Sequence, residues 1–558
     1  MYFKSFVQYC SRIQYILLQQ NEKVSSYYIY NYRNRISMNC REFSKIKHNV
    51  NLTNQNTQRT NSYTNRTHTC GELRYKNIGE KVTLCGWLQF QRLKKFLVLR
   101  DGYGVTQLVV SSEDQELQKL IDSLPYESIL EVEGIVVARP KDVETPTLFK
   151  ATPGGAQEYV VPTRFPGQFY SLVQSPQQFK QMLMAGAIDR YFQIARCYRD
   201  EGSRSDRQPE FTQLDIEMAF TSTEGIRKLV EEMLQYSWPT YLNPLPNTFN
   251  EMTYEDAMEK YGSDKPDTRF DFKLQNITQI LKPLNTLNQT DFYATCIIIE
   301  SGMKYSSSIR EKLNTFSQES TDVKFLHSKV RNKEDWIKNI GRILTDDVVF
   351  NLWNFCNLTE GCIVFLAFGP KLQTLSLMGK IRIEYANLLE EKGVQIKKDE
   401  MQMLWVTNFP LFELDHTTGT LQTVHHPFTA PHPEDLHLLD DLPLNVRSLA
   451  YDLVLNGNEI GGGSIRIHDP VLQEKLFQML SIDRLKLQHI LHMLSSGCPP
   501  HGGIALGIDR LMATILKTPS IRDVIAFPKT FEGRDPISGA PSEISEKEKQ
   551  LYHILTTS

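Results

Sequence analysis

The segment of residues 190–220, RYFQIARCYRDEGSRSDRQPEFTQLDIEMAF, constrains the fold more than any other part of the chain. Its second half alternates with a period of two, which is the repeat of a β-strand. One face carries apolar side chains, and the other carries Phe211, Gln213, Asp215 and Glu217. The first half alternates as well, and the stretch between the halves contains Gly, Pro and several charges. The segment therefore predicts an antiparallel hairpin with a long charged loop.

An ordinary solvated sheet face is the alternative interpretation of this alternation. Such a face is normally rich in Lys, Thr and Glu. Here an aromatic ring, an amide and two carboxylates follow one another along one face. This combination favours a ligand site on the hairpin.

A second candidate cluster is YDLVLNGNEIGGGSIRIHD, residues 451–469. Asp452 and Glu459 offer the hard carboxylate oxygens that Mg²⁺ prefers. The three glycines allow a ligand to approach the backbone closely, although a simple turn would also explain them. No Gly-Lys-Ser/Thr follows the glycines, which excludes a Walker loop.

A third cluster is HGGIALGIDRLMATIL, residues 501–516, in which a β run ends at Gly507 and a helix opens with Asp509 and Arg510. A cation in the first helical turn is disfavoured by the helix dipole, so an anion or an aromatic ring is expected beside Arg510.

The adjacent His425 and His426 could suggest a metal. Sequence neighbours rarely ligate together, however, and no third ligand lies at zinc spacing, so we expect no zinc.

The charge distribution divides the chain into two regions. The whole chain has a net charge of −3, whereas residues 1–64 contain nine Lys or Arg and two Glu, a net charge of about +7. This basic, hydroxyl-rich and acid-poor composition is typical of a mitochondrial presequence, and a basic tail that contacts RNA is the alternative. No apolar run approaches the length of a membrane span, and the nine scattered cysteines form no Cys-x-x-Cys motif.

Short β segments with turn residues run from about residue 67 to 138, which suits a small barrel such as the OB-fold. Within it Arg92, Phe96 and Gln107 offer a cation, a stacking ring and an amide to unpaired bases. A purely structural barrel is the alternative. Residues 141–270 and 401–530 carry the strongest patterns and are expected to form one unit, interrupted by an inserted domain.

The chain resembles the class II aminoacyl-tRNA synthetases, and more closely the aspartyl-tRNA synthetases of bacteria and mitochondria, over about residues 66–556. The resemblance rests on motifs in the family's order: QSPQQFK, YRDEGSRSDRQPEFTQLDIEM, HHPFTAPHP, NGNEIGGGSIRIH, GIALGIDRL and IRDVIAFPK. It implies an α+β fold with an antiparallel sheet of six or seven strands flanked by helices. An anticodon-binding OB-fold barrel would precede this sheet, and an α+β domain of the bacterial type would interrupt it.

The resemblance also implies the activity and its partners. ATP with Mg²⁺ and L-aspartate would give aspartyl-adenylate, and tRNA(Asp) would then accept the aspartyl group, in a homodimer of the mitochondrial matrix. The implied catalytic residues are Lys180, Arg199, Arg466 and Arg510. The implied ATP-binding residues are Arg199, Asp200, Glu201, Gln208, Phe211, Glu459, Gly507, Ile508, Asp509 and Arg510. The implied aspartate-binding residues are Gln177, Lys180, Gln213, Asp215, His425, His426 and Arg466. Asp452 and Glu459 would hold Mg²⁺, and Arg92, Phe96 and Gln107 would hold the anticodon.

The predicted domain organisation follows the same resemblance. The expected boundaries are 1–64 for the presequence, 65–140 for the OB-fold, 141–284 and 401–530 for the catalytic domain, 285–400 for the insertion and 531–558 for a C-terminal extension. The first catalytic segment would contain the end of the family's motif 1 and its motif 2, the segment 190–220, and the second would contain motif 3.

Two features depart from the family pattern. Gly154 stands where the bacterial pattern has a Glu that contacts the substrate. Aspartate binding is therefore expected to depend more strongly on Gln177 and Asp215. In residues 136–149, VVARPKDVETPTLF, the barrel runs almost directly into the end of motif 1. The last barrel strand and the long motif 1 helix of the dimer interface are therefore missing, as a skipped exon or a faulty gene model would produce.

Two alternatives to an aspartate-specific enzyme remain at this stage. An asparaginyl or lysyl enzyme is disfavoured by Lys180 and Arg466, which suit a carboxylate side chain. A catalytically impaired or silent tRNA-binding variant is favoured by the missing motif 1 but disfavoured by the intact motifs 2 and 3.

Overall fold

A computed structural model of the chain describes residues 28–30, 36–38, 66–92, 96–109, 121, 124–137, 144–202, 204–284, 291–318, 322–415 and 417–556. The chain divides into two compact units, Met1–Val143 and Glu144–Ser558. The predicted presequence lies outside the described residues except for two short strands. No helix in the described ranges is long and apolar enough to cross a membrane.

The smaller unit is a β-barrel. Its sheet has the order β1-β5-β4-β3-β6-β2, and β1 also pairs with β6, which closes the sheet. The strands are β1 (Tyr28–Tyr30), β2 (Ile36–Met38), β3 (Lys81–Arg92), β4 (Phe96–Asp101), β5 (Gly104–Val109) and β6 (Ile129–Val137), with the short helix η2 (Tyr75–Asn77) before β3. Alternate residues of these strands, such as Leu84, Leu99 and Val136, form the buried core.

The barrel contains strands from a segment that the sequence does not predict to be ordered. β1 and β2 come from residues 1–64, and β1 pairs in parallel with β5 through Tyr28 and Gln107. The predicted junction between barrel and motif 1 falls partly in residues 138–143, which lie outside the described residues.

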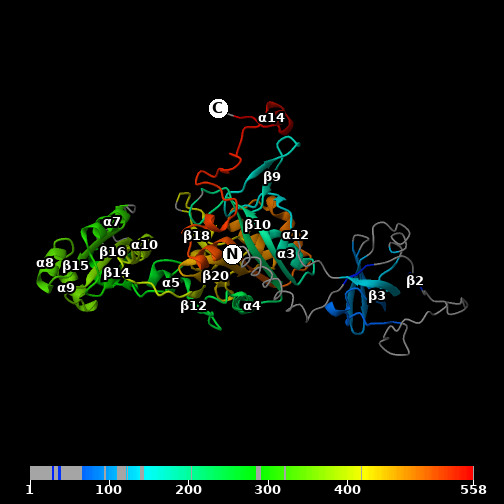
Figure 1. Cartoon of the computed structure of the whole chain (residues 1–558), viewed down its shortest axis with the longest axis horizontal. Coiled ribbons are helices and arrows are strands. Elements are labelled where there is room, and N and C mark those ends of the chain that lie inside the picture. Colours follow the sequence, from blue (N-terminus) through cyan, green and yellow to red (C-terminus); the bar gives the residue numbers. More distant parts are fainter. Residues whose placement is uncertain are drawn as a thin grey trace, which may run out of the picture. The chain divides into compact units, whose positions relative to one another are not determined.

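The larger unit is built on a seven-stranded sheet with the order β10-β11-β22-β21-β20-β17-β12 (Figure 1). All pairs are antiparallel except β12–β17. The strands are β10 (Arg190–Tyr198), β11 (Glu210–Ala219), β12 (Asn250–Thr253), β17 (Met403–Thr407), β20 (Ala450–Leu455), β21 (Asn458–Ile465) and β22 (His501–Gly507). The predicted hairpin is confirmed as β10 and β11, in which Gln193 pairs with Asp215.

Helices flank this sheet, as an α+β fold requires. α3 (Gln177–Ala185) and α13 (Ile508–Leu516) pack against β11, and α4 (Thr223–Ser237) packs against β22. α11 (Pro470–Met479) and α12 (Gln488–Ser495) pack together, and α12 also contacts α3. The helices place QSPQQFK and the residues after Gly507 beside the sheet.

Smaller elements connect and extend the sheet. β7 (Leu148–Phe149), β8 (Val160–Pro162) and β9 (Phe169–Leu172) form a three-stranded sheet, and β18 (Phe412–Leu414) pairs with β19 (Leu421–Thr423). The short helices are η4 (Pro433–Leu438), η5 (Pro443–Asn445), η6 (Arg484–Lys486) and η7 (Ile521–Val524), and α14 (Glu546–Tyr552) lies near the C-terminus.

The inserted segment forms its own α+β layer structure. Its sheet has the order β13-β14-β16-β15, made of β13 (Gln275–Asn276), β14 (Phe292–Ile299), β15 (Lys324–Lys329) and β16 (Ile363–Pro370). Its helices are α6 (Thr278–Leu281), η3 (Lys282–Leu284), α7 (Ser307–Gln318), α8 (Lys333–Gly341), α9 (Asp346–Phe355) and α10 (Lys371–Glu391). The long helix α10 contacts β14, β16 and α7, and it also contacts α5 (Tyr254–Tyr261) just before the insertion.

Candidate active site

A cavity of about 420 Å³ lies at the seven-stranded sheet, between motif 2 and motif 3. Most of the site residues predicted from the sequence line it. These are Gln177, Lys180, Arg199, Glu201, Gln208, Phe211, Gln213, His425, His426, Asp452, Glu459, Arg466, Gly507, Asp509 and Arg510. The fold thus brings together side chains that are up to 333 positions apart in the sequence.

Cations and an aromatic ring meet at one end of this cavity. Arg199 follows β10, and its guanidinium carbon lies 5.0 Å from the ring centroid of Phe211 on β11. The buried Nε of Arg199 has no hydrogen-bond partner among the described residues. Arg510, in the first turn of α13, donates from Nη1 to the Glu459 carbonyl at 2.8 Å. An anionic ligand would satisfy both guanidinium groups, as the position of Arg510 predicts.

Some predicted nucleotide-binding residues are engaged in bonds that shape the cavity wall. Glu201 forms an ion pair with Arg207 at 2.5 Å. The Gln208 amide bonds the backbone of Lys529 in both directions, at 2.7 and 3.3 Å. Asp509 accepts a hydrogen bond from the Thr212 backbone at 2.8 Å. These bonds attach the motif 2 loop to the C-terminal segment and to α13.

Three predicted residues of this unit do not line the cavity. Ile508 is buried. The Asp200 carboxylate lies beside Tyr159, where burial together with this carboxylate raises the pKa of the tyrosine hydroxyl. Asp215 is fully buried, although its neighbours Gln213 on β11 and Ala505 on β22 do line the cavity. These three assignments stay predictions.

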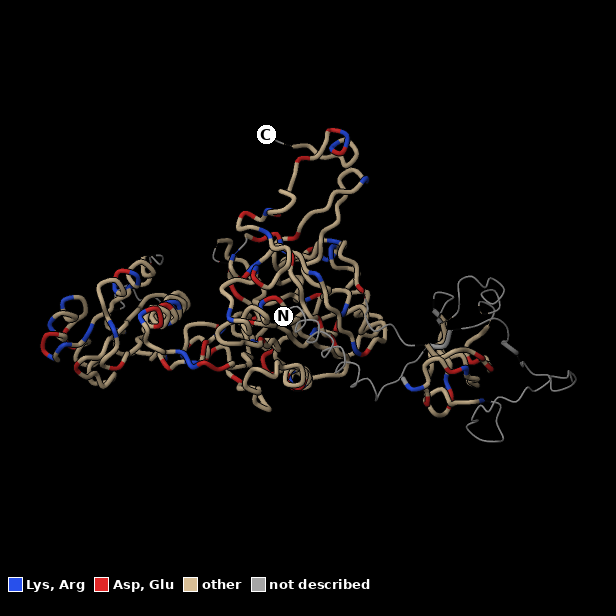
Figure 2. The backbone as a smooth tube through the Cα atoms, in the orientation of Figure 1, with Lys and Arg blue, Asp and Glu red and all other residues tan. Residues whose placement is uncertain are grey.

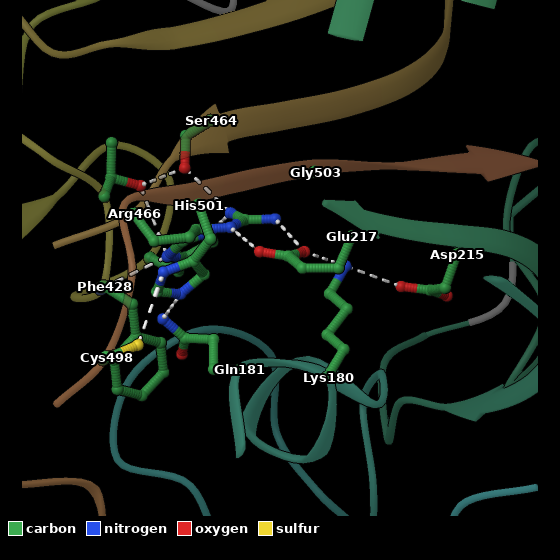
Figure 3. A network of polar contacts seen from close by, with 12 residues as sticks. Lys180, Gln181, Asp215, Glu217, Phe428, Ser464, Arg466, Cys498, His501 and Gly503 are labelled. Atoms are coloured by element: carbon green, nitrogen blue, oxygen red, sulfur yellow. Dashed lines mark hydrogen bonds and ion pairs between the residues drawn. The ribbon is translucent and has the colours of Figure 1, made fainter. Parts of the chain in front are cut away.

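A row of buried charges lies behind the other end of the cavity, which two of its members, Lys180 and Arg466, line (Figure 3). Lys180 Nζ lies 2.9 Å from Asp215 Oδ1 and 3.4 Å from Glu217 Oε2. Arg466 donates to both oxygens of Glu217, from Nε at 3.0 Å and from Nη2 at 3.2 Å. All four side chains are at most 2% exposed. The row therefore contains two cations and two carboxylates and has no net charge of its own.

Glu217 lies on the predicted polar face of the hairpin, but it was given no role among the expected site residues. The alternation of β11 places it on the same face as Asp215, and this was the available signal. Burial would raise the pKa of Glu217, but Arg466 and Lys180 outweigh burial and hold the pKa below its ordinary value. Glu217 is therefore ionised, and it joins the two cations that are predicted to bind a carboxylate ligand.

The two adjacent histidines, His425 and His426, contact different charged groups of the cavity. His426 contacts Arg466, and burial followed by the charge of Arg466 lowers the pKa of its imidazole well below the ordinary value. A neutral His426 accepts a hydrogen bond from the Arg466 guanidinium. His425 lies 3.2 Å from Asp452, whose carboxylate outweighs burial and raises the pKa of His425.

The carboxylates of Asp452 and Glu459 meet over Gly462. A Cβ at this glycine would lie 2.8 Å from Asp452 Oδ1 and 3.6 Å from Glu459 Oε1, so the space between them depends on the glycine. The pair fits Mg²⁺, which combines one or two carboxylates with phosphate oxygens and water. In the described ranges, no group of three or more His, Cys, Asp or Glu could hold a metal ion. A cation here would thus need ligands from a bound substrate.

Lys265 also lines the cavity and was not predicted from the sequence. It precedes the inserted domain and pairs with Glu459 at 2.9 Å between Nζ and Oε2. The sequence GSDKPD around it carries no periodic pattern that would have indicated a site.

Gly154 leaves open space in the cavity wall. It has a φ of +83°, and a Cβ there would meet nothing within 4 Å. The surrounding loop is held instead by Glu158, which accepts from the Thr152 backbone and from Gln174. The predicted loss of a substrate contact at Gly154 stays a prediction.

The barrel carries an exposed aromatic face of its own. Register pairs Arg92 with Phe96 and Val98 with Gln107, so the three predicted anticodon residues share one face of β3–β5. The neighbouring Trp87 and Phe90 are 41% and 52% exposed and were not predicted. Stacking platforms of this kind suit unpaired bases.

The comparisons with known proteins agree with this geometry. The family model described as tRNA synthetases class II (D, K and N) matches residues 141–531, and the OB-fold nucleic acid binding domain model matches residues 82–147. The chain belongs to the class II tRNA synthetases of the D, K and N group.

Within this group the chain is similar to aspartate–tRNA ligases. It is 41% identical to a mitochondrial aspartate–tRNA ligase of Bos taurus, over 90% of this chain and 92% of that protein. It is 40% identical to the mitochondrial enzyme of Homo sapiens, over 88% and 91%. An aspartate–tRNA(Asp/Asn) ligase of Dictyoglomus turgidum is 37% identical over 88% and 98%.

Proposed function

We propose that this chain is an ATP-dependent ligase that attaches L-aspartate to tRNA(Asp) in mitochondrial translation. The buried row of Lys180, Asp215, Glu217 and Arg466 carries the proposal, because it supplies two cations where an amino-acid side chain would lie. The similarity to mitochondrial aspartate–tRNA ligases supports the same substrate and the same compartment. We infer that the mature enzyme works in the matrix, where mitochondrial translation takes place.

The aspartate end of the cavity fits the charges of the free amino acid. The side-chain carboxylate would lie against Lys180 and Arg466, with His426 neutral beside them. Asp215 Oδ2 is buried and has no hydrogen-bond partner in the part of the chain that the structure describes, so it can accept from the α-ammonium. Gln177 Nε2 is a second buried polar atom with no partner there and lines the same end.

Selectivity follows from the same charges. Lys180 and Arg466 are already balanced by Asp215 and Glu217, so selectivity depends on the further hydrogen bonds that the two cations make with the ligand. Asparagine would place a neutral amide against them and lose the charge-assisted bonds that a carboxylate accepts, each stronger than a neutral hydrogen bond. Lysine would bring a third cation to the two already present. The pocket therefore favours aspartate over both.

The ATP end would hold the reacting phosphates. The aspartate α-carboxylate attacks the α-phosphorus, a P–O bond forms, and the bond to the β-phosphate breaks to release pyrophosphate. Arg199 would neutralise the α-phosphate, and Phe211 would stack on adenine. Asp452 and Glu459 would hold Mg²⁺, which neutralises the charge on the departing pyrophosphate. The protein contributes mainly positioning and fixed charge.

The direct test is aminoacylation of a mitochondrial tRNA(Asp) transcript with labelled aspartate. The proposal predicts ATP-dependent formation of aspartyl-tRNA by the full purified chain, which keeps the barrel strands β1 and β2. Absence of charging, with tRNA binding retained, would support the silent variant instead. Use of a tRNA(Asn) transcript in the same assay measures discrimination between the two tRNAs.

The exposed face of the barrel is proposed to bind the anticodon. Lys and Arg are interspersed with Asp and Glu along the described backbone, so tRNA binding would rest on local groups (Figure 2). Replacing Phe90 with alanine is expected to raise the KM for tRNA by about tenfold, since one base–ring stack contributes ~1–3 kcal/mol. ATP–pyrophosphate exchange without tRNA should stay unchanged. An unaltered KM for tRNA would contradict this role of the barrel face.

We infer that the shortened motif 1 region weakens the homodimer that the family is expected to form. The alignment to the bovine relative spans 596 positions, more than the 558 residues of this chain, which supports a deletion. Apolar side chains on β8 and β9, including Val160, Phe169 and Tyr170, are exposed in the single chain. Without the motif 1 helix, we expect a partner chain to cover such side chains less well. Sedimentation velocity should give mainly monomer at micromolar concentration, whereas a stable and active dimer would contradict this inference.

A further inference from the structure

The loop between α5 and the inserted domain reaches the ATP end of the cavity. Lys265 lies in this loop, lines the cavity and is 37% exposed along its side chain. Its ammonium lies 2.9 Å from Glu459 Oε2. Arg510 Nη1 lies 3.9 Å from the same oxygen. Two cations therefore converge on one carboxylate, at the place where the phosphate chain of ATP is proposed to bind.

The ion pair between Lys265 and Glu459 describes the protein with no nucleotide in the cavity. If Glu459 held Mg²⁺, its Oε2 would be a weaker partner for the Lys265 ammonium. Lys265 would then be able to donate to a phosphate group of a nucleotide bound in the cavity. An ammonium with three rotatable donors can move from a carboxylate to a phosphate without a change in the backbone.

The inserted domain holds this loop from the other side. Arg382 of α10 is 1% exposed and donates to three backbone carbonyls of the loop, those of Asp267, Phe270 and Phe272, at 2.8–2.9 Å. Its guanidinium carbon lies 3.8 Å from the centroid of the Phe270 ring. The side-chain hydrogen bonds described for Arg382 all go to the backbone of this loop.

The start of the loop packs directly on the same helix. Gly262 ends α5 with a φ of +66°, and a Cβ there would lie 2.6 Å from the Gly379 backbone nitrogen. A Cβ at Gly379 would lie 2.2 Å from the Gly262 carbonyl oxygen. Only two glycines permit this backbone contact between α5 and α10. The loop is thus fixed to α10 on both sides of Lys265.

The loop also touches the turn that precedes Glu459. A Cβ at Gly457 would lie 3.0 Å from Asp267 Cβ. Thr268 donates to Gln402 at 2.7 Å, and the Gln402 backbone donates to Asn456 at 2.9 Å. A continuous set of contacts therefore joins α10 of the inserted domain to the β20–β21 turn and to Glu459.

We propose that Lys265 is a further ATP-binding residue that contacts the β- or γ-phosphate, and that Arg382 positions it from the inserted domain. This inference rests on the proposed function, because it assumes that the cavity binds ATP. It gives the inserted domain a role in the reaction, which is to hold the Lys265 loop against the catalytic sheet.

The test is MgATP binding to the full purified chain by isothermal titration calorimetry. Lys265→Met is expected to weaken MgATP binding by about tenfold, because it removes one charge-assisted hydrogen bond. Aspartate binding should not change. Lys260→Met is the matched control, since Lys260 pairs with Asp256 on the exposed side of α5 and should leave both affinities unchanged. A folded Lys265→Met variant with wild-type MgATP affinity would overturn the assignment.

A double-mutant cycle tests the positioning role of Arg382. Arg382→Lys keeps the charge, but a lysine side chain cannot donate to all three carbonyls. As a single substitution it is therefore expected to lower MgATP affinity by about threefold. In the Lys265→Met background the same substitution should have no further effect. If Arg382→Lys lowered MgATP affinity by the same threefold in the Lys265→Met background, Arg382 would affect ATP binding independently of Lys265. This result would overturn the positioning role.

The proposed function is checked separately by aspartate-dependent pyrophosphate exchange of the wild-type chain. If the wild type exchanges and Lys265→Met binds MgATP normally, only the assignment of Lys265 fails. If the wild type neither exchanges nor binds MgATP, the proposed function fails, and this inference fails with it.

Discussion

Replacing Lys180 with methionine is expected to lower kcat/KM for aspartate by about 10³-fold, because it removes one of two cations from a fully buried charge row. Lys180 balances both Asp215 and Glu217. Without it the row carries one excess negative charge and repels the substrate carboxylate. Pyrophosphate exchange at varied aspartate concentration measures the loss.

The same substitution is expected to destabilise the fold, by about 3–5 kcal/mol, since it leaves a buried carboxylate without its partner. The double variant Lys180→Met with Asp215→Asn separates the two effects, because it returns the row to neutrality. We expect the double variant to recover most of the stability while aspartate activation stays lost. Wild-type exchange by either variant would contradict the assignment of Lys180.

Replacing Glu459 with glutamine is expected to lower kcat of aspartate-dependent exchange by about 10²–10³-fold, since it removes one of the two carboxylates proposed to hold Mg²⁺. Asp452 and Glu459 border the space over Gly462. Glutamine keeps the size and removes the charge, so binding of aspartate should not change. Exchange at saturating Mg²⁺ together with calorimetry of aspartate binding measures both quantities.

Glu413→Gln is the matched control for this experiment. Glu413 lies on β18, is exposed and contacts only Gln422 among the hydrogen bonds described for it. Its replacement is expected to leave kcat unchanged. A Glu459→Gln variant with kcat close to that of the control would contradict the proposed cation site.

The hairpin and the site that it carries could be predicted because strand periodicity is a local property. The alternation after Phe211 fixed which residues share a face, and the structure confirms the pairing of β10 with β11. The glycines of β21 likewise indicated close packing, and Gly462 lies between two carboxylates. In both cases the side chain needs only its own strand and the neighbouring strand to reach the site.

Residues that depend on distant packing could not be predicted in the same way. Glu217 becomes a site residue only because Lys180 and Arg466, which are far away in the sequence, converge on it. Lys265 reaches the cavity on a loop whose backbone is bonded by Arg382 of the inserted domain, more than 100 positions further along the chain. Asp509 lines the cavity and accepts from the Thr212 backbone, and its expected role in ATP binding stays a prediction.

The barrel shows a similar division between what periodicity can and cannot predict. The strands β3–β6 followed from short apolar runs separated by turn residues, and the register places the positions of Arg92, Phe96 and Gln107 on one face. The exposed Trp87 and Phe90 were not singled out, because an apolar residue in a strand is ordinarily expected in the core. β3 has a bulge between Leu88 and Phe90, which changes the face that follows it and cannot be predicted from alternation.

The central claim is that this cavity activates aspartate and rejects its neutral and cationic relatives. ATP–pyrophosphate exchange, run separately with aspartate, asparagine and lysine, tests it most directly. The charge row of Lys180, Asp215, Glu217 and Arg466 predicts exchange with aspartate alone. Exchange with asparagine or lysine, or no exchange with any of the three, would contradict the account.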